Sequence, residues 1–333
     1  MNVRTSRDPK QLTEAMLAGD RVALARLITL VENRTLHSTE IMSRIYSRCG
    51  NATTIGITGP PGAGKSTLTS CVIEHLRARG KTVGVVAVDP SSPFTGGSVL
   101  GDRIRMQKHF LDPGVFIRSL STRGSHGGLA RAGRDVARLF DAFGKDFVVI
   151  ETVGVGQTEL DIMEVADTVV VVLVPEAGDT IQVMKAGLLE IANVFVVNKA
   201  DREGATRMRT ELEMMLHLKT SEGEDAEWKV PVLMTQASKG EGAEALLDAC
   251  LSHVEFLNGR SGGKQLGKRA RGEVLDICEE ELMRRLRARS GDPLIASMLD
   301  AVTRGEIDPY QAALDLLGSE QGLAKLIARD GNG

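Results

Sequence analysis

Gly59-Pro60-Pro61-Gly62-Ala63-Gly64-Lys65-Ser66-Thr67 lies between an apolar run, 54–58, and a helical pattern that continues to residue 79. In the order strand, loop and helix, the pattern G-x-x-x-x-G-K-[ST] is typical of a phosphate-binding loop, where backbone N–H groups and a helix N-terminus surround phosphate oxygens. We expect Lys65 to reach the β- and γ-phosphates and the Ser66 hydroxyl to bind Mg²⁺. A glycine-rich turn with an incidental lysine is less favoured, because all three elements are present.

Apolar runs after residue 52 predict a doubly wound sheet. They are continuous rather than alternating, which is typical of parallel strands covered by helices on both faces. The runs are 54–58, 83–88, 147–150, 169–174, 194–197 and 232–234. Stretches of helical length lie between them at 127–143, 202–218 and 241–257. We therefore predict an α/β phosphate-loop domain with a mostly parallel sheet over 51–258.

Helical patterns flank this domain on both sides. Residues 11–49 carry apolar residues at helical spacing, so 1–50 is predicted to be a helical extension. A glycine-containing linker opens the region 259–333, where a long helix should carry an apolar stripe of Val274, Cys278, Leu282 and Leu286. The stripe suggests a dimerisation arm. The alternative, that it covers its own domain, is nearly as well supported because every surface helix has an apolar face.

Composition narrows the classes of partner. A net charge of −3 and an aromatic content of 3% give no reason to expect nucleic acid or an anionic membrane. The four cysteines form no cluster, which favours a reducing compartment. No apolar run approaches the ~20 residues of a membrane helix. Residues 1–10 lack the apolar core of a signal peptide, so we expect a cytoplasmic protein.

Acidic residues directly follow two of the predicted strands. Asp89 and Glu151 should therefore lie at the carboxyl edge of the sheet, where ligands bind in open α/β folds. With Ser66 they are expected to hold Mg²⁺, directly or through its water. Asp102 is a second carboxylate in the loop that follows Asp89, and a further candidate ligand. Alternatively, Asp89 caps a turn before Pro90.

The run 151–157, Glu-Thr-Val-Gly-Val-Gly-Gln, occupies the position of a γ-phosphate sensor. We expect the Gly154 N–H to meet the γ-phosphate, so that hydrolysis releases the loop. Val155 stands where Ras-like proteins have the glutamine that orients water, and Gln157 lies farther along. Intrinsic hydrolysis should therefore be slow and depend on a partner. The expected catalytic residues are Lys65, Asp89, Glu151 and Gln157.

The run Asn198-Lys199-Ala200-Asp201 predicts guanine recognition. The Asp201 carboxylate can accept from guanine N1–H and the exocyclic amine, whereas adenine presents an acceptor at the same place. Lys199 can lie along the base plane. Backbone N–H groups of Gln236-Ala237-Ser238 are expected to meet guanine O6. The expected ligands are therefore GTP and GDP.

Together these motifs resemble those of the MeaB/ArgK family of metallochaperone-type GTPases, whose human relative is the methylmalonic aciduria type A protein. The markers are residues 59–66, 88–92, 151–157 and 198–201, and the similarity covers nearly the whole chain. The resemblance implies a homodimeric GTPase that gates adenosylcobalamin delivery to methylmalonyl-CoA mutase and protects that enzyme. It also implies that 175–185 is a further switch with Asp179 and Lys185 at its key charged positions. Mg²⁺ is implied, and no tightly bound organic cofactor.

Two other classes remain as alternatives. A phosphate-loop kinase of the ArgK type would transfer the γ-phosphate to a protein or metabolite, but most kinases use ATP, which leaves the guanine motif unexplained. A nickel-inserting GTPase of the hydrogenase or urease type would carry a Cys/His cluster. None of the six histidines pairs with a cysteine at ligand spacing, and His126 lies in a predicted glycine-rich loop.

Overall fold

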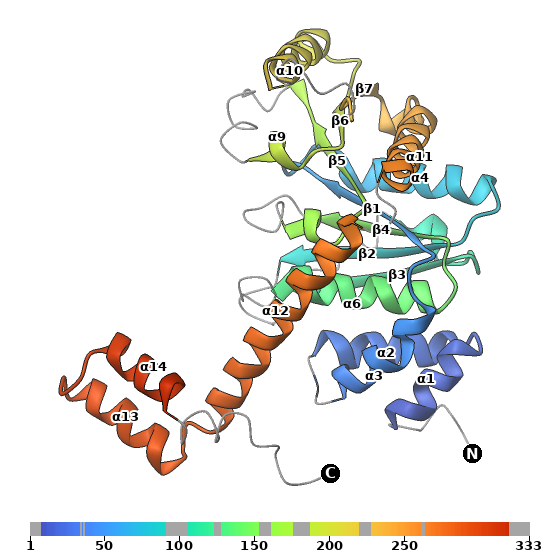
Figure 1. The fold of residues 1–333 in the computed structure, drawn as a ribbon. Helices are drawn as coiled ribbons and strands as arrows, with labels where there is room; N and C mark the ends of the chain where they lie inside the picture. Colours follow the sequence, from blue (N-terminus) through green and yellow to red (C-terminus); the bar gives the residue numbers. More distant parts are fainter. Residues whose placement is uncertain are drawn as a thin grey trace. The chain divides into compact units, whose positions relative to one another are not determined.

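The computed structural model describes residues 8–33, 35, 37–90, 106–122, 128–152, 161–175, 187–219, 228–260 and 264–319. The chain divides into two compact units, Met1–Arg260 and Ser261–Gly333. The first unit contains the sheet and its covering helices (Figure 1). The described residues of the second, 264–319, form three helices.

The described residues of the first unit form a seven-stranded sheet in the order β3-β2-β4-β1-β5-β6-β7. Its strands are β1 Thr53–Thr58, β2 Val83–Pro90, β3 Val115–Thr122, β4 Phe147–Thr152, β5 Thr168–Leu173, β6 Val194–Asn198 and β7 Val232–Thr235. All the pairings among them are parallel. Strands β4 and β5 are buried along their whole length, which explains their continuously apolar sequences. The predicted doubly wound fold is confirmed.

Strand β3 is absent from the predicted set of strands. Its sequence mixes apolar residues with Arg118, Ser119 and Ser121, so it lacks a continuous apolar run. The reason is its position at the sheet edge, where it pairs with β2. The partly exposed Arg118 guanidinium donates to Glu32 Oε2 at 3.0 Å and to Thr29 Oγ1 at 2.9 Å. An edge strand can carry such polar residues because one side is not covered by another strand.

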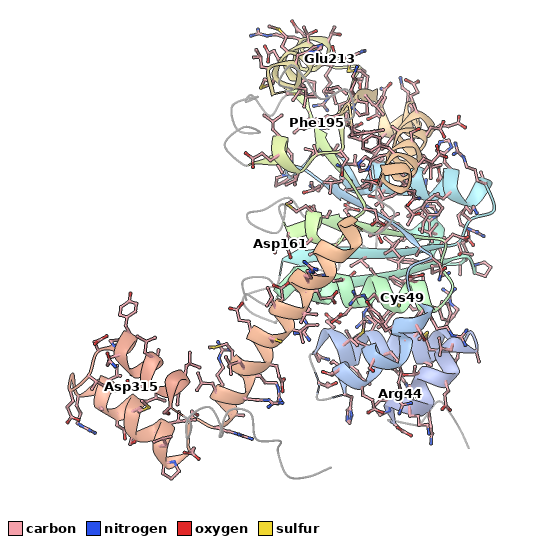
Figure 2. All side chains as sticks on the ribbon, in the orientation of Figure 1. Arg44, Cys49, Asp161, Phe195, Glu213 and Asp315 are labelled. Carbon is pink, nitrogen blue, oxygen red and sulfur yellow. The ribbon has the colours of Figure 1, made fainter. Side chains whose placement is uncertain are left out.

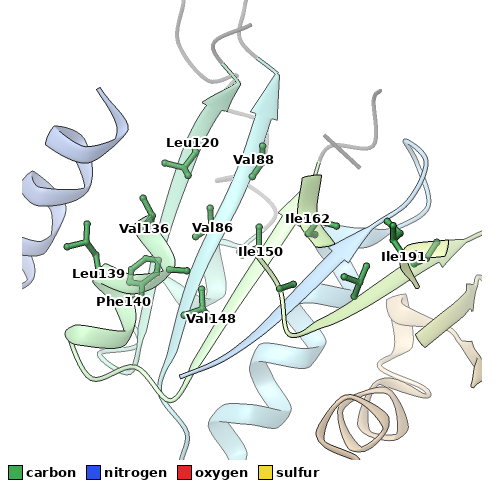
Figure 3. Packing of buried hydrophobic residues seen from close by; sticks show 14 of the residues in the cluster. Val86, Val88, Leu120, Val136, Leu139, Phe140, Val148, Ile150, Ile162 and Ile191 are labelled. Atoms are coloured by element: carbon green, nitrogen blue, oxygen red, sulfur yellow. The ribbon is translucent and has the colours of Figure 1, made fainter. Parts of the chain in front are cut away.

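Helices cover both faces of the sheet. Helices α4 Lys65–Ala78 and α11 Ala243–Arg260 share one core with the inward residues of β1, while α6 Gly128–Ala142 packs on the other face. Figure 3 shows Val136, Leu139 and Phe140 of α6 against the strands. The remaining helical segments of this half are α9 Leu188–Ile191, α10 Ala205–Lys219 and the short turns η2 Gln107–His109, η3 Ile162–Glu164 and η5 Ala237–Lys239.

The N-terminal helices pack onto this domain. They are α1 Pro9–Leu17, α2 Arg21–Glu32 and α3 Ser38–Ile45, followed by the turn η1 Tyr46–Arg48. The carboxylates of Asp8 and Asp20 accept hydrogen bonds from backbone N–H groups and cap α1 and α2. Buried Leu24 and Ile41 belong to the same core cluster as Phe140 of α6. The extension therefore shares its core with the sheet domain.

Charged side chains lie on the outer faces of the helices, as Figure 2 shows for Arg44 in α3 and Glu213 in α10. Both belong to ion pairs within their helix, Arg44 with Glu40 and Glu213 with Arg209. Within the described residues, no helix has the length and apolarity required to cross a bilayer.

The described residues of the second unit form α12 Lys264–Ala288, α13 Pro293–Thr303 and α14 Pro309–Gly318, and α12 is the predicted long helix. Asp292 and Asp308 cap the last two helices, each directly before a proline at the first helical position. Ile295 is the one fully buried apolar side chain among those described in this unit. Several others are exposed: Val274, Leu275, Ile277, Met283, Leu299, Tyr310, Leu314 and Leu317.

Candidate nucleotide-binding site

Three glycines of the loop between β1 and α4 have positive φ angles, Gly59, Gly62 and Gly64, and at two of them a side chain would also have no room. Gly59 has φ 137° and Gly64 has φ 86°. A Cβ atom on Gly59 would lie 2.0 Å from the Val172 carbonyl oxygen, and one on Gly64 would lie 2.4 Å from Nδ2 of Asn198. Both positions therefore need glycine, for conformation and for space. The loop is held at the N-terminus of α4, where phosphate oxygens bind in this type of fold.

Lys65 lies across this loop. Its Nζ donates to the carbonyl oxygens of Gly59 at 2.7 Å and Pro60 at 2.9 Å, and the side chain is buried. The ammonium is thus positioned by the loop itself, as the sequence motif requires. Phosphate oxygens would be stronger acceptors than these neutral carbonyls, because they carry negative charge and would form an ion pair with the ammonium.

Ser66 and Glu151 meet directly behind the loop. The Ser66 hydroxyl, in the first turn of α4, donates to Glu151 Oε1 at 2.5 Å, and both side chains are buried. They meet because β4 is the neighbour of β1 and ends at the same edge of the sheet. A hydroxyl and a carboxylate are the hard oxygen donors that Mg²⁺ prefers, so this pair fits the predicted metal site.

The other predicted metal and switch residues are described in part or not at all. The Asp89 backbone lies near the end of β2, opposite Ser121, so it reaches the same edge of the sheet. Its side chain is not among those described. Several predicted residues lie outside the described residues, and their roles stay predictions: Asp102, Gly154, Gln157, Asp179 and Lys185.

Asn198 connects the phosphate loop to the predicted base-binding segments. Its Nδ2 donates to the Ala63 carbonyl at 2.8 Å, while its Oδ1 accepts from Thr235 Oγ1 at 3.0 Å and from the Ala237 N–H at 3.1 Å. The side chain is 3% exposed. The predicted contact of Asn198 with the nucleotide stays a prediction. The structure shows that its amide bonds to two other segments, the phosphate loop and the end of β7, and so positions the loops around the site.

The residues after Asn198 turn sharply. Lys199 has φ 56°, a left-handed conformation that is uncommon for a residue with a side chain and is enriched at functional sites. Ala200 N–H donates to the Thr235 carbonyl at 3.0 Å, which fixes the turn against the end of β7. Asp201 is exposed at this edge, so its carboxylate is open to a ligand.

The backbone of the opposing loop, 236–238, is hydrogen-bonded within the protein. The Gln236 N–H donates to the Glu241 carbonyl at 3.0 Å, and the Ala237 N–H donates to Asn198. Both groups have acceptors within the protein in this structure, and the contact of Gln236, Ala237 and Ser238 with guanine O6 stays a prediction. Sequence reasoning missed Thr235, whose hydroxyl supports Asn198 and which lies directly before this loop.

A further buried polar pair ties η2 to α4. His109 Nε2 lies 2.8 Å from Ser70 Oγ, and burial lowers the pKa of His109, which favours the neutral imidazole. This pair fixes η2 against α4. In the part of the chain that the structure describes, no group of three or more His, Cys, Asp and Glu side chains could hold a metal ion. A nickel-type cluster is therefore not found there.

Comparison with known proteins places the chain among GTPases. The family model for the methylmalonyl-CoA mutase-associated GTPase MeaB matches residues 24–291. A putative GTPase of Pyrococcus abyssi is 49% identical over 305 residues, which cover 91% of this chain and 94% of the relative. The GTPase ArgK of Escherichia coli is 35% identical over 300 residues, 87% of this chain and 90% of the relative.

A mammalian relative and a solved structure extend the similarity. The mitochondrial methylmalonic aciduria type A homolog of Mus musculus is 33% identical over 272 residues, 77% of this chain and 66% of that protein. The crystal structure of a LAO/AO transport system kinase aligns with a TM-score of 0.65 and 28% identity. That alignment covers 92% of this chain and 95% of the other, so the two share a fold over nearly their whole length.

Proposed function

This chain belongs to the MeaB family of methylmalonyl-CoA mutase-associated GTPases, and on that basis we propose that it is a nucleotide-dependent chaperone of methylmalonyl-CoA mutase. The activity of the family is hydrolysis of GTP to GDP and phosphate. One observation carries the assignment to this site: Lys65, the Ser66–Glu151 pair and the Asn198–Asp201 turn come together at the carboxyl edge of one sheet.

The phosphate half of the site acts by position and charge. The N-terminus of α4 and the loop backbone receive the phosphate oxygens, and Lys65 exchanges its loop carbonyls for them. Ser66 and Glu151 would hold Mg²⁺, with Asp89 and Asp102 as further proposed ligands. Bound there, Mg²⁺ supplies positive charge to the β- and γ-phosphate oxygens.

The base half of the site selects guanine. Asp201 is exposed on a turn that Asn198 and Thr235 hold in place, so its carboxylate can accept from guanine N1–H and the exocyclic amine. Lys199 lies along the base plane and Ser238 approaches O6. Adenine would put an acceptor against the Asp201 carboxylate, which disfavours ATP.

The output of the site is proposed to be conformational. Gly154 senses the γ-phosphate, and no glutamine follows it directly, so hydrolysis is slow alone and accelerated by the partner. Gln157 is the proposed residue for positioning water. The segment 175–185, with Asp179 and Lys185, couples nucleotide state to the mutase and so gates delivery of adenosylcobalamin.

The second unit is proposed to form a homodimer. Its helices leave Val274, Leu275, Tyr310 and Leu314 exposed, with 59%, 70%, 83% and 66% of their surface accessible. So much apolar surface on three helices favours burial against another chain. The proposed assembly is two copies of this protein with the mutase as client, without nucleic acid or membrane.

The test is GTP hydrolysis by the purified protein, with and without adenosylcobalamin-dependent methylmalonyl-CoA mutase, and with ATP as the control nucleotide. If the mutase stimulates hydrolysis of GTP but not of ATP, the result supports both the proposed guanine selectivity and the proposed partner. Slow GTP hydrolysis at the same rate with and without the mutase would contradict the proposed partner but would still support GTPase activity. Lys65→Ala is the matched control, because it should abolish nucleotide binding and leave the fold intact.

A variant of this assay distinguishes a GTPase from a kinase. With γ-labelled GTP, a GTPase releases the label as free phosphate, whereas a kinase leaves it on an acceptor. Label on the mutase or on another added acceptor would contradict the proposed function.

A further inference from the structure

Two buried threonines connect the phosphate-loop strand to the strand that carries Glu151. Thr152 Oγ1 donates to Thr58 Oγ1 at 2.8 Å. Their side chains are 1% and 0% exposed, so the bond forms away from water. Thr58 directly precedes Gly59, the first residue of the phosphate loop, and Thr152 directly precedes the segment 153–157.

The bond lies where the strand pairing ends. The register of β1 with β4 runs from Thr53–Phe147 to Ile57–Glu151, and the threonines follow one residue later on each strand. Side chains alternate along a strand, so Glu151 reaches α4 on one face while Thr152 lies on the other. The hydroxyl bond therefore continues the connection between the strands at the point where the backbone ladder stops.

Packing alone does not explain these residues. Nearby positions on the same face, such as Ile150 and Val171, are apolar and belong to the large core cluster. Valine has nearly the shape of threonine and would fill the same space without a polar atom. Burying a hydroxyl costs free energy unless it is hydrogen-bonded. Unlike two valines, the threonine pair therefore fixes the position of one strand end relative to the other through a directional bond.

We propose that Thr58 and Thr152 are positioning residues for GTP hydrolysis, holding the start of the phosphate loop in register with the start of the γ-phosphate-sensing segment. A movement of one segment is then transmitted to the other through one short buried bond. The inference rests on the proposed role of 153–157 in contacting the γ-phosphate. It predicts that the bond matters when GTP is bound and much less when GDP is bound.

Thr152→Val removes the bond and keeps the shape, and Thr152→Ser restores a hydroxyl. We expect Thr152→Val to lower kcat for GTP about fivefold, the equivalent of the ~1 kcal/mol of one hydrogen bond. Affinity for a non-hydrolysable GTP analogue should fall by a similar factor, while affinity for GDP stays within about twofold. Thr152→Ser should recover both values. Thr54→Val, at the amino end of β1, the strand that carries Thr58, is the matched control and should leave kcat unchanged.

Thr58→Val removes the same bond from the other strand, and tests the inference if Thr152→Val folds poorly. Because one bond is lost in each case, the double variant should be no worse than either single one. Three results would overturn this inference without affecting the proposed function. They are a wild-type kcat in a folded Thr152→Val protein, losses of kcat that add up in the double variant, and a Thr152→Ser protein that does not recover kcat. Absence of GTP hydrolysis by the wild-type protein would overturn the proposed function as well.

Discussion

Replacing Asn198 tests whether its amide holds the site together or contacts the base. Asn198→Ala removes three hydrogen bonds, at 2.8, 3.0 and 3.1 Å, from a side chain that is 3% exposed. At ~1 kcal/mol for each bond, the free energy of unfolding should fall by ~3 kcal/mol. For a domain of this size that corresponds to a fall of roughly 6–12 °C in Tm.

The decisive measurement is the thermal unfolding of the protein without nucleotide. A bridge between protein segments stabilises the empty protein, whereas a base contact acts only when nucleotide is bound. Asn198→Asp should also destabilise the empty protein, because it replaces the donor with an oxygen that faces the Ala63 carbonyl. GDP affinity, measured by calorimetry, should fall with both variants.

Asp201→Ala is the control for this experiment. Asp201 is exposed, so its removal should change the free energy of unfolding by less than ~0.5 kcal/mol and still weaken GTP binding. An unchanged Tm in Asn198→Ala, combined with lost nucleotide affinity, would refute the bridging role and indicate that Asn198 contacts the base instead.

Three more expectations concern charge and chemistry. Burial lowers the pKa of Lys145 to about 8, with Arg21 and Arg77 acting in the same direction, so the unfolded chain keeps this proton to higher pH. The free energy of unfolding should therefore rise between about pH 8 and pH 10, and Lys145→Met should remove that rise in urea titrations. Ser66→Ala should weaken the Mg²⁺ dependence of nucleotide binding on the order of tenfold, measured by calorimetry with and without Mg²⁺. Asp201→Asn should shift preference from GTP toward xanthosine triphosphate in competition binding, because a donor replaces an acceptor.

Sequence predicted the buried part of the fold well, because burial leaves a strong pattern. Strands β4 and β5 lie in the middle of the sheet, and their continuous apolar runs predicted buried parallel strands. Edge strand β3 escaped prediction, since Arg118 bonds to a helix far away in sequence and has no local signal. A strand with one open side does not need to be apolar.

Roles within the site were harder to predict than membership of it. The motif residue Asn198 was found at the site, but its partners Ala63 and Thr235 come from two other loops, and only the fold shows that they meet. The bond from the Ala237 N–H to Asn198 likewise depends on contact between two loops. Thr58 and Thr152 could not be recognised at all, because threonine is common in strands and its hydrogen bond depends on register.

The position of β1 in the middle of the sheet has a consequence for synthesis on the ribosome. The phosphate loop is made early, yet Ser66 must wait for a partner 85 residues later, and Ala63 for one 135 residues later. Strand β1 itself pairs with β4 and β5, both made long after it. A nascent chain that ends before Phe147 therefore contains β1 with neither of its neighbouring strands. Until β4 and β5 have been made, the apolar residues of β1 are exposed to aggregation, and nucleotide can stabilise the protein only after that point.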